Sequence, residues 1–394
     1  MFSSKKSSFL RHVAQTSLTP EGFEVSRADG IYLYDQEGKP FIDCNSGIAV
    51  SSFGHNHPVI RKAILDQLDL HLHTMVYGEH VQQSQVRLAE KLAHLLPAGL
   101  DCTYFVNSGA EAVEGAMKLA RKFTGRYEIM ACRNAYHGST LGAESLRSDF
   151  MHTAGARPLV PGIRHIDFNS LEDLDKISKN TAAVILEPIQ GEAGVILPEK
   201  NYLSAVLNRC KEVGALMILD EIQTGMGRTG SMFAFEKENV KPDILLLAKA
   251  FGGGLPLGAF IASQEIMKAL SHDPPLGHMT TFGGHPLSCA SSLAAFEILE
   301  KENLTEKANA LENIFKEKIS GHAAVKEIRG RGLMLAIELN DPAQLHPIVQ
   351  RCRENGLLLD WFLFNDRSIR FYPPLIINES DVQLICEKLL KSLD

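Results

Sequence analysis

The amino-acid sequence predicts an α/β fold with a mostly parallel central sheet in a large domain, joined to a smaller α+β domain. From roughly residue 58 to residue 290, short apolar runs alternate with amphipathic helical patterns, which is typical of parallel strands connected by helices. From about residue 295 the pattern changes to helices mixed with isolated strand candidates. The 394 residues also exceed what one hydrophobic core usually organises. We therefore expect a large domain over 51–295 and a small domain formed by 1–50 and 296–394.

The strand candidates of the large domain are short, and several are almost wholly apolar. Strands that helices cover on both faces have this composition. The candidates are CTYFV (102–106), EIMAC (128–132), AAVILE (182–187), LMILD (216–220), ILLLA (244–248) and AFIAS (259–263). A helix is expected over 111–124, where one apolar face is formed by Ala112, Ala116, Leu119, Ala120 and Phe123.

The two ends of the chain supply the expected small domain. Residues 31–43, IYLYDQEGKPFID, predict a β-hairpin with a polar turn at 35–39. Towards the C-terminus we expect a helix containing Leu311 and Phe315, a segment at 328–339, another helix, a strand within 369–375 and a final helix. Because an open sheet edge needs a partner, we expect the N-terminal hairpin to join these C-terminal elements.

The bulk composition excludes several classes of protein. A formal net charge of −7 gives no electrostatic reason to expect nucleic acid or an anionic membrane as a partner. No apolar run is long enough to cross a bilayer, and the start, MFSSKKSSFLRHVAQ, lacks the apolar core of a signal peptide. The seven cysteines are scattered without a CxxC pair, so reduced thiols are expected rather than disulfides or a zinc site. A cytoplasmic protein is expected.

The first motif with chemical content is VNSGAEAVEGAMKLAR (106–121). A strand ends in Asn107-Ser108-Gly109, and a helix is expected to begin at Ala110 or Glu111. Backbone N–H groups at a helix N-terminus, together with Ser108, form a suitable site for a phosphate. The alternative is that Ser108 only caps the helix, and for this motif taken alone that is the better interpretation.

The second motif, LMILDEIQTGMGRTG (216–230), places Asp220 at the carboxyl end of a buried strand. Ligands bind at this edge of open α/β sheets. A buried carboxylate there needs a cation or several donors. A protonated pyridine nitrogen would satisfy it, and so, equally, would a structural arginine.

The third motif, PDILLLAKAFGGGLPLGAF (242–260), places Lys249 directly after an apolar strand and before three glycines. Such a lysine either extends its ammonium to solvent or has a function. Removal from water and nearby cations lower the pKa of an amine, and the free amine attacks an aldehyde. The stretch does not match GxGxxG, because Leu257 replaces the last glycine, and no Walker A sequence is present. A nicotinamide dehydrogenase is therefore disfavoured.

In their order along the chain, these motifs closely resemble the class III (ω-amino-acid) aminotransferases of fold type I, a pyridoxal-phosphate-dependent family, and in particular the acetylornithine, ornithine and 4-aminobutyrate aminotransferases. The resemblance covers nearly the whole chain. It rests on SGIAV (46–50), GHNHP (54–58), NSGAEAVEGAMKLAR (107–121), AYHG (135–138), EPIQGEAG (187–194), DEIQTGMGRTG (220–230), LAKAFGGGLPLGA (247–259), TTFGGHPL (280–287) and IRFYPPL (369–375).

The resemblance implies a role for each matching residue around pyridoxal 5'-phosphate. Lys249 corresponds to the lysine that carries the cofactor as a Schiff base and moves the substrate proton, and Asp220 to the partner of the pyridine nitrogen. Gln223 would donate to the phenolic oxygen, and the ring of Tyr136 would stack on the pyridine. The remaining cofactor-binding residues implied are Ser108, Gly109 and Ala110 at the phosphate, His137, Glu187, and Thr281, which reaches the phosphate of the other subunit in a homodimer with shared active sites.

The resemblance also implies a substrate switch. Glu192 neutralises Arg370 when an amine donor binds, and it moves away when Arg370 grips the α-carboxylate of a keto acid through a bidentate contact. Ile48 is a further substrate-binding candidate, because GIAV is closest to the acetylornithine and 4-aminobutyrate branches.

One departure concerns the substrate. The acetylornithine, ornithine and 4-aminobutyrate members usually have arginine directly after HG, where this sequence has Ser139. That arginine holds the distal carboxylate of the substrate. Arg147 or Arg157 are alternative cations for this role. HGST is also found in members that use pyruvate and simple ω-amines.

The function that the resemblance implies is a ping-pong transamination. The amino group moves from an ω-amino or amino-acid donor, N-acetylornithine or ornithine-like, to 2-oxoglutarate or pyruvate. A 4-aminobutyrate or other ω-amino acid:pyruvate aminotransferase is the alternative, followed by an aminomutase, a decarboxylating member of this fold and a non-catalytic cofactor-binding protein. Trp361, the only tryptophan, lies in LLLDWFLFND (357–366), where packing in the small domain is favoured over a role in lining the substrate site.

Overall fold

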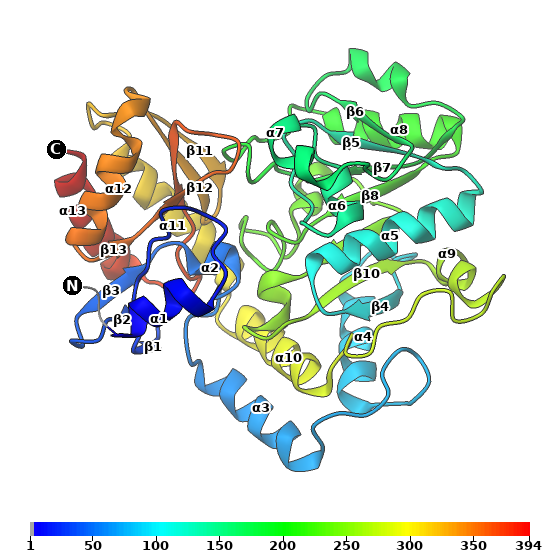
Figure 1. The fold of residues 1–394 in the computed structure, drawn as a ribbon, viewed down its shortest axis with the longest axis horizontal. Coiled ribbons are helices and arrows are strands. Elements are labelled where there is room, and N and C mark those ends of the chain that lie inside the picture. Colours follow the sequence, from blue (N-terminus) through cyan, green and yellow to red (C-terminus); the bar gives the residue numbers. More distant parts are fainter. Residues whose placement is uncertain (1–3) are drawn as a thin grey trace.

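The computed structural model describes residues 4–394. Residues 1–3 begin the segment that was expected not to be a signal peptide, and they lie outside the described residues. The predicted fold class is confirmed, with a central seven-stranded sheet covered by helices (Figure 1). In order across the sheet, the strands are β4 (Cys102–Val106), β10 (Gly258–Ala262), β9 (Ile244–Leu247), β8 (Leu216–Asp220), β7 (Thr181–Leu186), β5 (Glu128–Cys132) and β6 (Ile163–Ile166). Within the described residues, no helix is long and apolar enough to cross a membrane.

The pairing within this sheet is parallel from β9 to β6, and β10 runs antiparallel to both of its neighbours. The six strand candidates correspond to observed strands within one residue at each end. The antiparallel direction of β10 was not predicted, since an apolar run carries no information about direction. β6, with the sequence IRHI, was also missed, because two of its four residues are polar.

Alternating residues of the central strands belong to two separate cores, one on each face of the sheet. In β8, Met217 and Leu219 pack in one core, whereas Leu216 and Ile218 pack in the other. This explains why the strand is apolar throughout instead of alternating with polar residues. The helices of this part are α3 (Pro58–Leu70), α4 (Gln83–Leu95), α5 (Gly109–Thr124), α6 (Leu141–Ser145), α7 (Phe150–Thr153), α8 (Tyr202–Val213), α9 (Gln264–Met267) and α10 (Pro286–Lys301).

Helix α5 covers the second core, as its predicted apolar face requires. It begins at Gly109, one or two residues earlier than expected, because Ser108 caps it, and ends at the left-handed Gly125. Four residues of the predicted face are fully buried, while Phe123 in the last turn is 38% exposed.

The other part of the molecule contains two four-stranded sheets. The first has the order β1 (Arg27–Asp29), β2 (Tyr32–Tyr34), β3 (Pro40–Asp43) and β13 (Leu357–Leu358). The second has the order β11 (Val325–Arg331), β12 (Met334–Leu339), β15 (Ser368–Phe371) and β14 (Asp360–Trp361). The accompanying helices are α1 (Ser4–His12), α2 (Ser46–Ala49), α11 (Leu304–Ile319), α12 (Leu345–Glu354) and α13 (Glu379–Leu393). Short 3-10 turns span Ala154–Ala156, Glu172–Lys176, Ala234–Glu238, Lys249–Gly252, Lys268–Ser271 and Pro342–Gln344.

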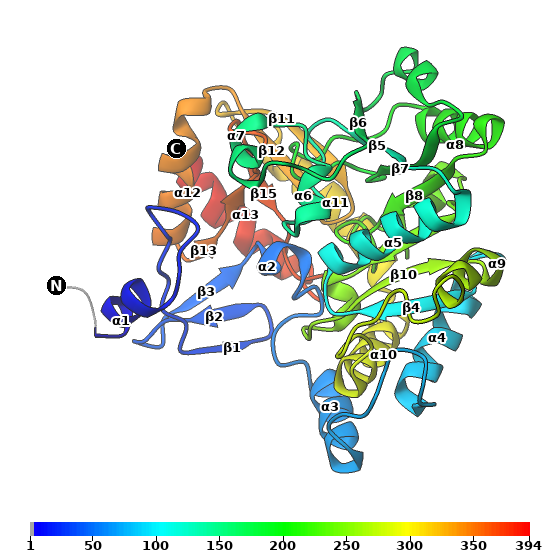
Figure 2. The ribbon, with the colours of Figure 1, turned by 45° about the vertical axis from the view of Figure 1, so that its right-hand side comes forward.

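The N-terminal hairpin β2–β3 meets the C-terminal elements through β13, which pairs with β3 in parallel. Figures 1 and 2 show the blue N-terminal strands beside the orange and red C-terminal helices, on the side opposite β5 to β8. The expected strand segment 328–339 folds as two antiparallel strands, β11 and β12, with a turn at Gly332. Residue 295 falls inside the continuous helix α10. All seven cysteines are free thiols.

Candidate active site

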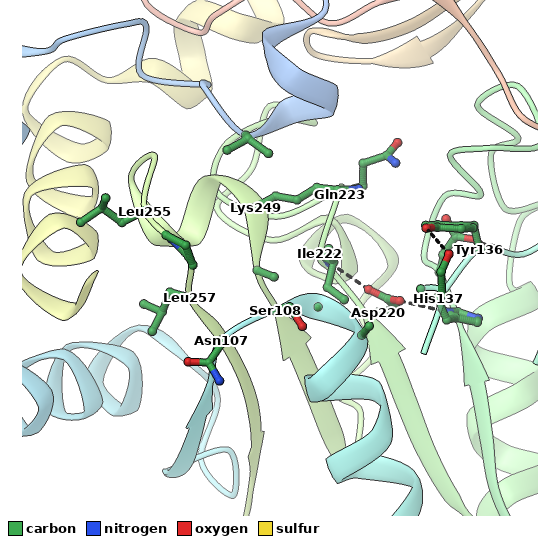
Figure 3. Close-up of a pocket in the computed structure, with 18 of the residues that line it drawn as sticks. Asn107, Ser108, Tyr136, His137, Asp220, Ile222, Gln223, Lys249, Leu255 and Leu257 are labelled. Carbon is green, nitrogen blue, oxygen red and sulfur yellow. Dashed lines mark hydrogen bonds and ion pairs between the residues drawn. The ribbon is translucent and has the colours of Figure 1, made fainter. Parts of the chain in front are cut away.

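A cavity of about 430 Å³ opens at the carboxyl edge of the central sheet (Figure 3). The ends of β4, β7, β8 and β9 meet there, because the two antiparallel pairings of β10 return β4 to the direction of β9. The residues that line the cavity are Val50, Asn107, Ser108, Gly109, Ala110, Tyr136, His137, Gly138, Ser139, Glu187, Asp220, Ile222, Gln223, Ala248, Lys249, Gly254, Leu255, Pro256 and Leu257. Residues separated by more than 100 positions in sequence thus share one cavity.

Lys249 follows β9 with a strained backbone, since its φ of 52° lies in the left-handed region that lysine rarely adopts. Figure 3 shows its side chain extending into the cavity towards Gln223. Burial lowers the pKa of the amine, and the charges of Glu192 and Asp220 only partly oppose this. The result favours a neutral amine, which is the nucleophilic form of lysine.

Three ionisable residues at strand ends form what we call the strand-end cluster: His137, Glu187 and Asp220. Asp220 accepts hydrogen bonds from Ile222 N at 3.0 Å and faces His137 Nδ1 at 2.7 Å (Figure 3). Burial would lower the pKa of His137, but the hydrogen bond and charge of Asp220 raise it. Burial raises the pKa of Glu187 to about 7, with the charge of His137 opposing and that of Asp220 adding to the shift. The cluster is therefore fixed by short contacts and carries carboxylates in a poorly solvated place.

The Ser108 loop has the geometry of a helix cap and also lines the cavity. Ser108 Oγ accepts from Glu111 N at 3.2 Å, so the capping interpretation of this residue describes an observed contact. Gly109 and Ala110 belong to the first turn of α5, where backbone N–H groups have no acceptor within the helix. Both functions are compatible, because the cap uses the hydroxyl oxygen while the N–H groups of the first turn stay available to an anion.

A second group, which we call the bridging cluster, joins the two parts of the molecule: Glu192, Gln223, Arg370 and Tyr372. Arg370 Nη2 donates to Glu192 Oε2 at 2.7 Å, with both side chains buried. Gln223 Nε2 donates to Glu192 Oε1 at 3.2 Å, and Tyr372 Oη donates to Gln223 Oε1 at 2.9 Å. Among the described residues, Nε and Nη1 of Arg370 have no hydrogen-bond partner although they are buried.

The ion pair in the bridging cluster sets the charge states of its members. Burial would lower the pKa of Arg370, but the charge of Glu192 raises it. Burial likewise would raise the pKa of Glu192, but Arg370 and Lys249 lower it. Both groups are therefore charged, and each depends on the other to remain so in a buried place.

The segment containing Trp361 contributes its backbone to this cluster. The carbonyl of Trp361 accepts from Arg370 Nη2 at 2.9 Å, and Leu363 N donates to Glu192 Oε2 at 3.1 Å. The Trp361 ring is 42% exposed and packs edge-on against His346 of α12. The side chain thus packs within the C-terminal part, as favoured from the sequence, while the main chain holds Glu192 and Arg370 in place.

Three further candidates differ in their relation to the cavity. Ile48, in the short α2, has a left-handed backbone and is absent from the lining, where its neighbour Val50 takes part. Thr281 is exposed and outside the cavity of its own chain. Ser139 does line the cavity; its exposed hydroxyl lies 3.1 Å from that of Tyr136. Of the three glycines after Lys249, only Gly254 lines the cavity.

Tyr372 and Asn107 are among the residues of the site that were not singled out from the sequence. Tyr372 lies within IRFYPPL, two positions after Arg370, and this i, i+2 spacing on a strand would have placed both on one face. Asn107 donates through Nδ2 to Glu111 and to Thr280 Oγ1, at 2.9 Å each, and so ties the Ser108 loop to the segment before Thr281. No sequence pattern indicated this second link.

Comparisons with known proteins agree with this geometry. The family model described as "Aminotransferase class-III" matches residues 13–393. The ornithine aminotransferase of Toxoplasma gondii is 32% identical with a TM-score of 0.90, covering 98% of this chain and 93% of its own. An acetylornithine aminotransferase from Elizabethkingia anophelis is also 32% identical, with a TM-score of 0.84 and coverage of 98% and 97%. An (S)-enantioselective omega-transaminase from Thermomicrobium roseum is 27% identical, with a TM-score of 0.91 and coverage of 100% and 99%.

A family match over nearly the whole chain, with two relatives above 30% identity, decides the classification. The structure of the Toxoplasma enzyme determined with oxidised glutathione is described as having partial occupancy of PLP at the active site. The chain therefore belongs to the class III aminotransferases, the pyridoxal-phosphate-dependent enzymes whose resemblance its motifs had indicated.

Proposed function

We propose that this enzyme moves an amino group from an ω-amino or amino-acid donor, with an N-acetylornithine or ornithine-like donor favoured, to a keto acid. The acceptor is 2-oxoglutarate or pyruvate, and the two half-reactions follow each other in a ping-pong order. The observation that carries the proposal is that Lys249, Asp220 and the first turn of α5 open on one cavity. They supply an amine, a carboxylate and a set of anion-binding N–H groups.

These groups fit pyridoxal 5'-phosphate. Ser108 and the N–H groups of Gly109 and Ala110 would hold the phosphate, Asp220 the protonated pyridine nitrogen, and Lys249 the aldehyde carbon. Tyr136 lines the same cavity and offers a flat face for stacking. When bound, the cofactor supplies an electron sink next to the carbon that carries the amino group.

The remaining steps depend on the chain's own residues. Because burial lowers the pKa of Lys249, its Nζ is able to take the proton from the donor carbon that bears the amino group and, in the second half-reaction, to deliver a proton to the carbonyl carbon of the keto acid. His137 holds Asp220 in place through the 2.7 Å contact, and Glu187 fixes the loops on either side by accepting from Gly191 N and Tyr136 N. His137 thus positions the acid, Glu187 positions the two loops, and both residues also line the cavity that would hold the cofactor.

The bridging cluster accounts for two unlike substrates. Arg370 Nε and Nη1 have no partner among the described residues, so they are available to the α-carboxylate of a keto or amino acid. Glu192 neutralises the remaining charge when the bound donor presents no carboxylate at that place. The proposal includes a large domain over 51–295 and a small domain over 1–50 and 296–394, because Glu192 belongs to the first and Arg370 to the second. Helix α10 spans the boundary at residue 295.

We also propose a homodimer in which Thr281 reaches the cofactor phosphate of the partner subunit. Thr281 is exposed beside Met279 and Phe282, whose side chains are 56% and 54% exposed. Apolar side chains gathered around an exposed polar residue favour a protein contact over contact with water.

An ω-amino acid:pyruvate aminotransferase is the second candidate. Two observations favour it: Ser139 presents a hydroxyl where the amino-acid-specific branches have a guanidinium, and the Thermomicrobium roseum enzyme is an omega-transaminase. A donor panel of N-acetylornithine, ornithine, lysine, 4-aminobutyrate and β-alanine, each with 2-oxoglutarate and with pyruvate, discriminates between the two.

The test of the proposed function uses the holoenzyme and two lysine variants. Adding an amine donor should remove the absorbance band of the carbonyl form of the cofactor, and adding a keto acid should restore it. Lys249→Ala should lower turnover by about 10³-fold or more, because the proton carrier is lost. Lys241→Ala, which removes an exposed lysine near the start of β9 that donates to Ala98 O, is the matched control and should keep full turnover. Undiminished turnover in Lys249→Ala would refute the proposal.

A further inference from the structure

Arg147, in the loop after α6, is a buried arginine whose guanidinium is only partly paired. Its side chain is 5% exposed. Nη1 lies 3.3 Å from both carboxylate oxygens of Glu144, and Nε lies 3.3 Å from Asp149 Oδ2. Nη2 is buried and has no hydrogen-bond partner among the described residues. A buried N–H donor without an acceptor is costly, which indicates that this end of the guanidinium meets a group that is not part of the chain.

The place of Arg147 connects it to the active site. Its guanidinium carbon lies 5.8 Å from the centre of the Tyr136 ring and 5.2 Å from that of Phe364. Tyr136 lines the active-site cavity, and Phe364 N donates to the backbone carbonyl of Glu192. Arg147 therefore lies between a ring of the cavity wall and the segment that holds the bridging cluster.

The cavity itself is poor in cations. Among the described residues that line it, Lys249 is the only lysine and there is no arginine. Beside Tyr136 the lining includes the hydroxyl of Ser139, 3.1 Å from that of Tyr136. A substrate with two carboxylates needs a second cation besides Arg370, and an uncharged hydroxyl does not supply the charge.

We propose that Arg147 binds the distal carboxylate of a dicarboxylic keto acid, with the Tyr136 and Ser139 hydroxyl groups completing its hydrogen bonds. The proposal rests on the proposed transamination and narrows its acceptor to the 2-oxoglutarate class. Nη2 supplies the unpaired donor, and the rings of Tyr136 and Phe364, 5.8 and 5.2 Å from the guanidinium carbon, pack against the guanidinium.

Glu144 and Asp149 have a defined part in this arrangement. Their contacts hold Nη1 and Nε, so the guanidinium reaches the substrate with Nη2 instead of with a bidentate pair. Their negative charges also reduce the attraction for a further carboxylate, so the hydrogen bonds of Nη2 and the two hydroxyl groups carry most of the selectivity. The same contacts bury the arginine without leaving it uncompensated when the cavity holds a monocarboxylate.

Arg157, the other arginine considered for this role, has a different environment. It is exposed, and its guanidinium lies 5.1 Å from the centre of the Phe150 ring, whose side chain is itself 67% exposed. Neither arginine is in the cavity lining, but Arg147 packs on Tyr136 of the cavity wall whereas Arg157 packs on the exposed Phe150, so Arg157 is a matched control for the loss of one positive charge in the same segment.

The experiment compares acceptors in the holoenzyme, Arg147→Gln, Arg147→Lys and Arg157→Gln. The donor half-reaction is measured first, from the absorbance of the cofactor, and only then is 2-oxoglutarate or pyruvate added. The ratio of kcat/KM for 2-oxoglutarate to that for pyruvate should fall about 10- to 100-fold in Arg147→Gln, mainly through KM. Arg147→Lys should lose less, and Arg157→Gln should keep the wild-type ratio. Glutarate should inhibit the wild type competitively against the keto acid and inhibit Arg147→Gln about tenfold less well.

The outcomes separate the two proposals. If no donor changes the cofactor absorbance of the wild type, the proposed transamination itself fails. If donors react but the acceptor ratio is the same in the wild type and Arg147→Gln, or both acceptors lose equally, Arg147 is only a structural residue and the inference is overturned. A wild type that binds neither 2-oxoglutarate nor glutarate overturns it too. Should Arg147→Gln not fold, Arg147→Lys and glutarate inhibition decide the matter.

Discussion

The strand-end cluster lines the cavity and the bridging cluster reaches it through Gln223, but the two clusters are built in opposite ways. His137, Glu187 and Asp220 follow three strands of a single sheet, and both oxygens of Asp220 and of Glu187 have partners. Glu192 and Arg370 are 178 residues apart and meet only because the two parts of the molecule pack together. Arg370 also keeps two buried donors unpaired among the described residues.

This difference indicates a division of labour. A fully paired carboxylate on a parallel sheet keeps its place through the reaction, which is what a permanent cofactor requires. Under the proposed function, the spare donors of the buried Arg370 would let it take the carboxylate of one substrate in place of Glu192. His137 Nε2 is the exception in the strand-end cluster, since it is buried without a partner among the described residues.

Within the two clusters, the largest expected effect comes from removing the charge of Asp220. Asp220→Asn should lower kcat/KM about 10³-fold, because a neutral amide does not stabilise the positive charge of a protonated pyridine nitrogen. Steady-state kinetics with a saturating donor measures it. The matched control is Asp243→Asn, which neutralises another carboxylate of the same part of the fold; Asp243 accepts from Met217 N, at the far end of β8 from the cavity. Equal activity of the two variants would contradict the role of Asp220.

The next effect concerns the pH dependence of stability. The pKa of Glu187 is raised by burial from 4.5 to about 7, so the folded protein holds this proton more tightly than the unfolded chain does. The contribution of Glu187 to the free energy of unfolding should therefore be most favourable below about pH 4.5 and should decrease as the pH rises to about 7. The decrease attributable to Glu187 is about 3 kcal/mol at 1.36 kcal/mol per pH unit.

Glu187→Gln should remove that decrease. Urea unfolding of the enzyme without cofactor, at several values between pH 5 and pH 8, measures the difference between wild type and variant. Glu90→Gln, an exposed position on α4, is the control and should reproduce the wild-type slope. If the free energy of unfolding of Glu187→Gln fell with pH as steeply as that of the wild type, burial in the strand-end cluster would not be what destabilises the charged form of Glu187.

What the sequence predicted well has local causes. Apolar runs locate the strands of a doubly covered sheet, and a serine before a helical pattern locates its cap, so the surroundings of Ser108, Asp220 and Lys249 follow from short segments. The direction of β10 and the existence of β6 do not follow, because pairing direction depends on the whole topology and IRHI lacks an apolar pattern.

Three members of the bridging cluster were expected only through family resemblance, and the fourth, Tyr372, was not expected at all. Nothing near Glu192 in sequence indicates Arg370, and the partners of both include backbone groups of Trp361 and Leu363, which no side-chain pattern encodes. The partial pairing of Arg147 was likewise out of reach, since it depends on burial between Tyr136 and Phe364. Long-range contacts of this kind require the folded structure.

The smallest effect, about tenfold, is expected at the ion pair between Glu192 and Arg370. In Glu192→Gln the α-carboxylate of a keto acid competes with a neutral amide for Arg370 instead of with a carboxylate. KM for the keto acid should fall about tenfold, and KM for a donor that presents no carboxylate to Arg370 should rise, because the uncompensated guanidinium then stays buried. Measuring both KM values in full ping-pong kinetics gives the two opposite changes from one variant.

Glu338→Gln is the control that separates this exchange from a general loss of charge. Glu338 is a buried glutamate of β12, paired with Lys326 at 2.8 Å and with Arg329, and β12 is the neighbour of the strand that carries Arg370. Its variant should leave the ratio of donor KM to acceptor KM unchanged. If Glu192→Gln moved both KM values in the same direction, the ion pair would be a fixed structural contact like those of the strand-end cluster, and the contrast between the two clusters would no longer hold.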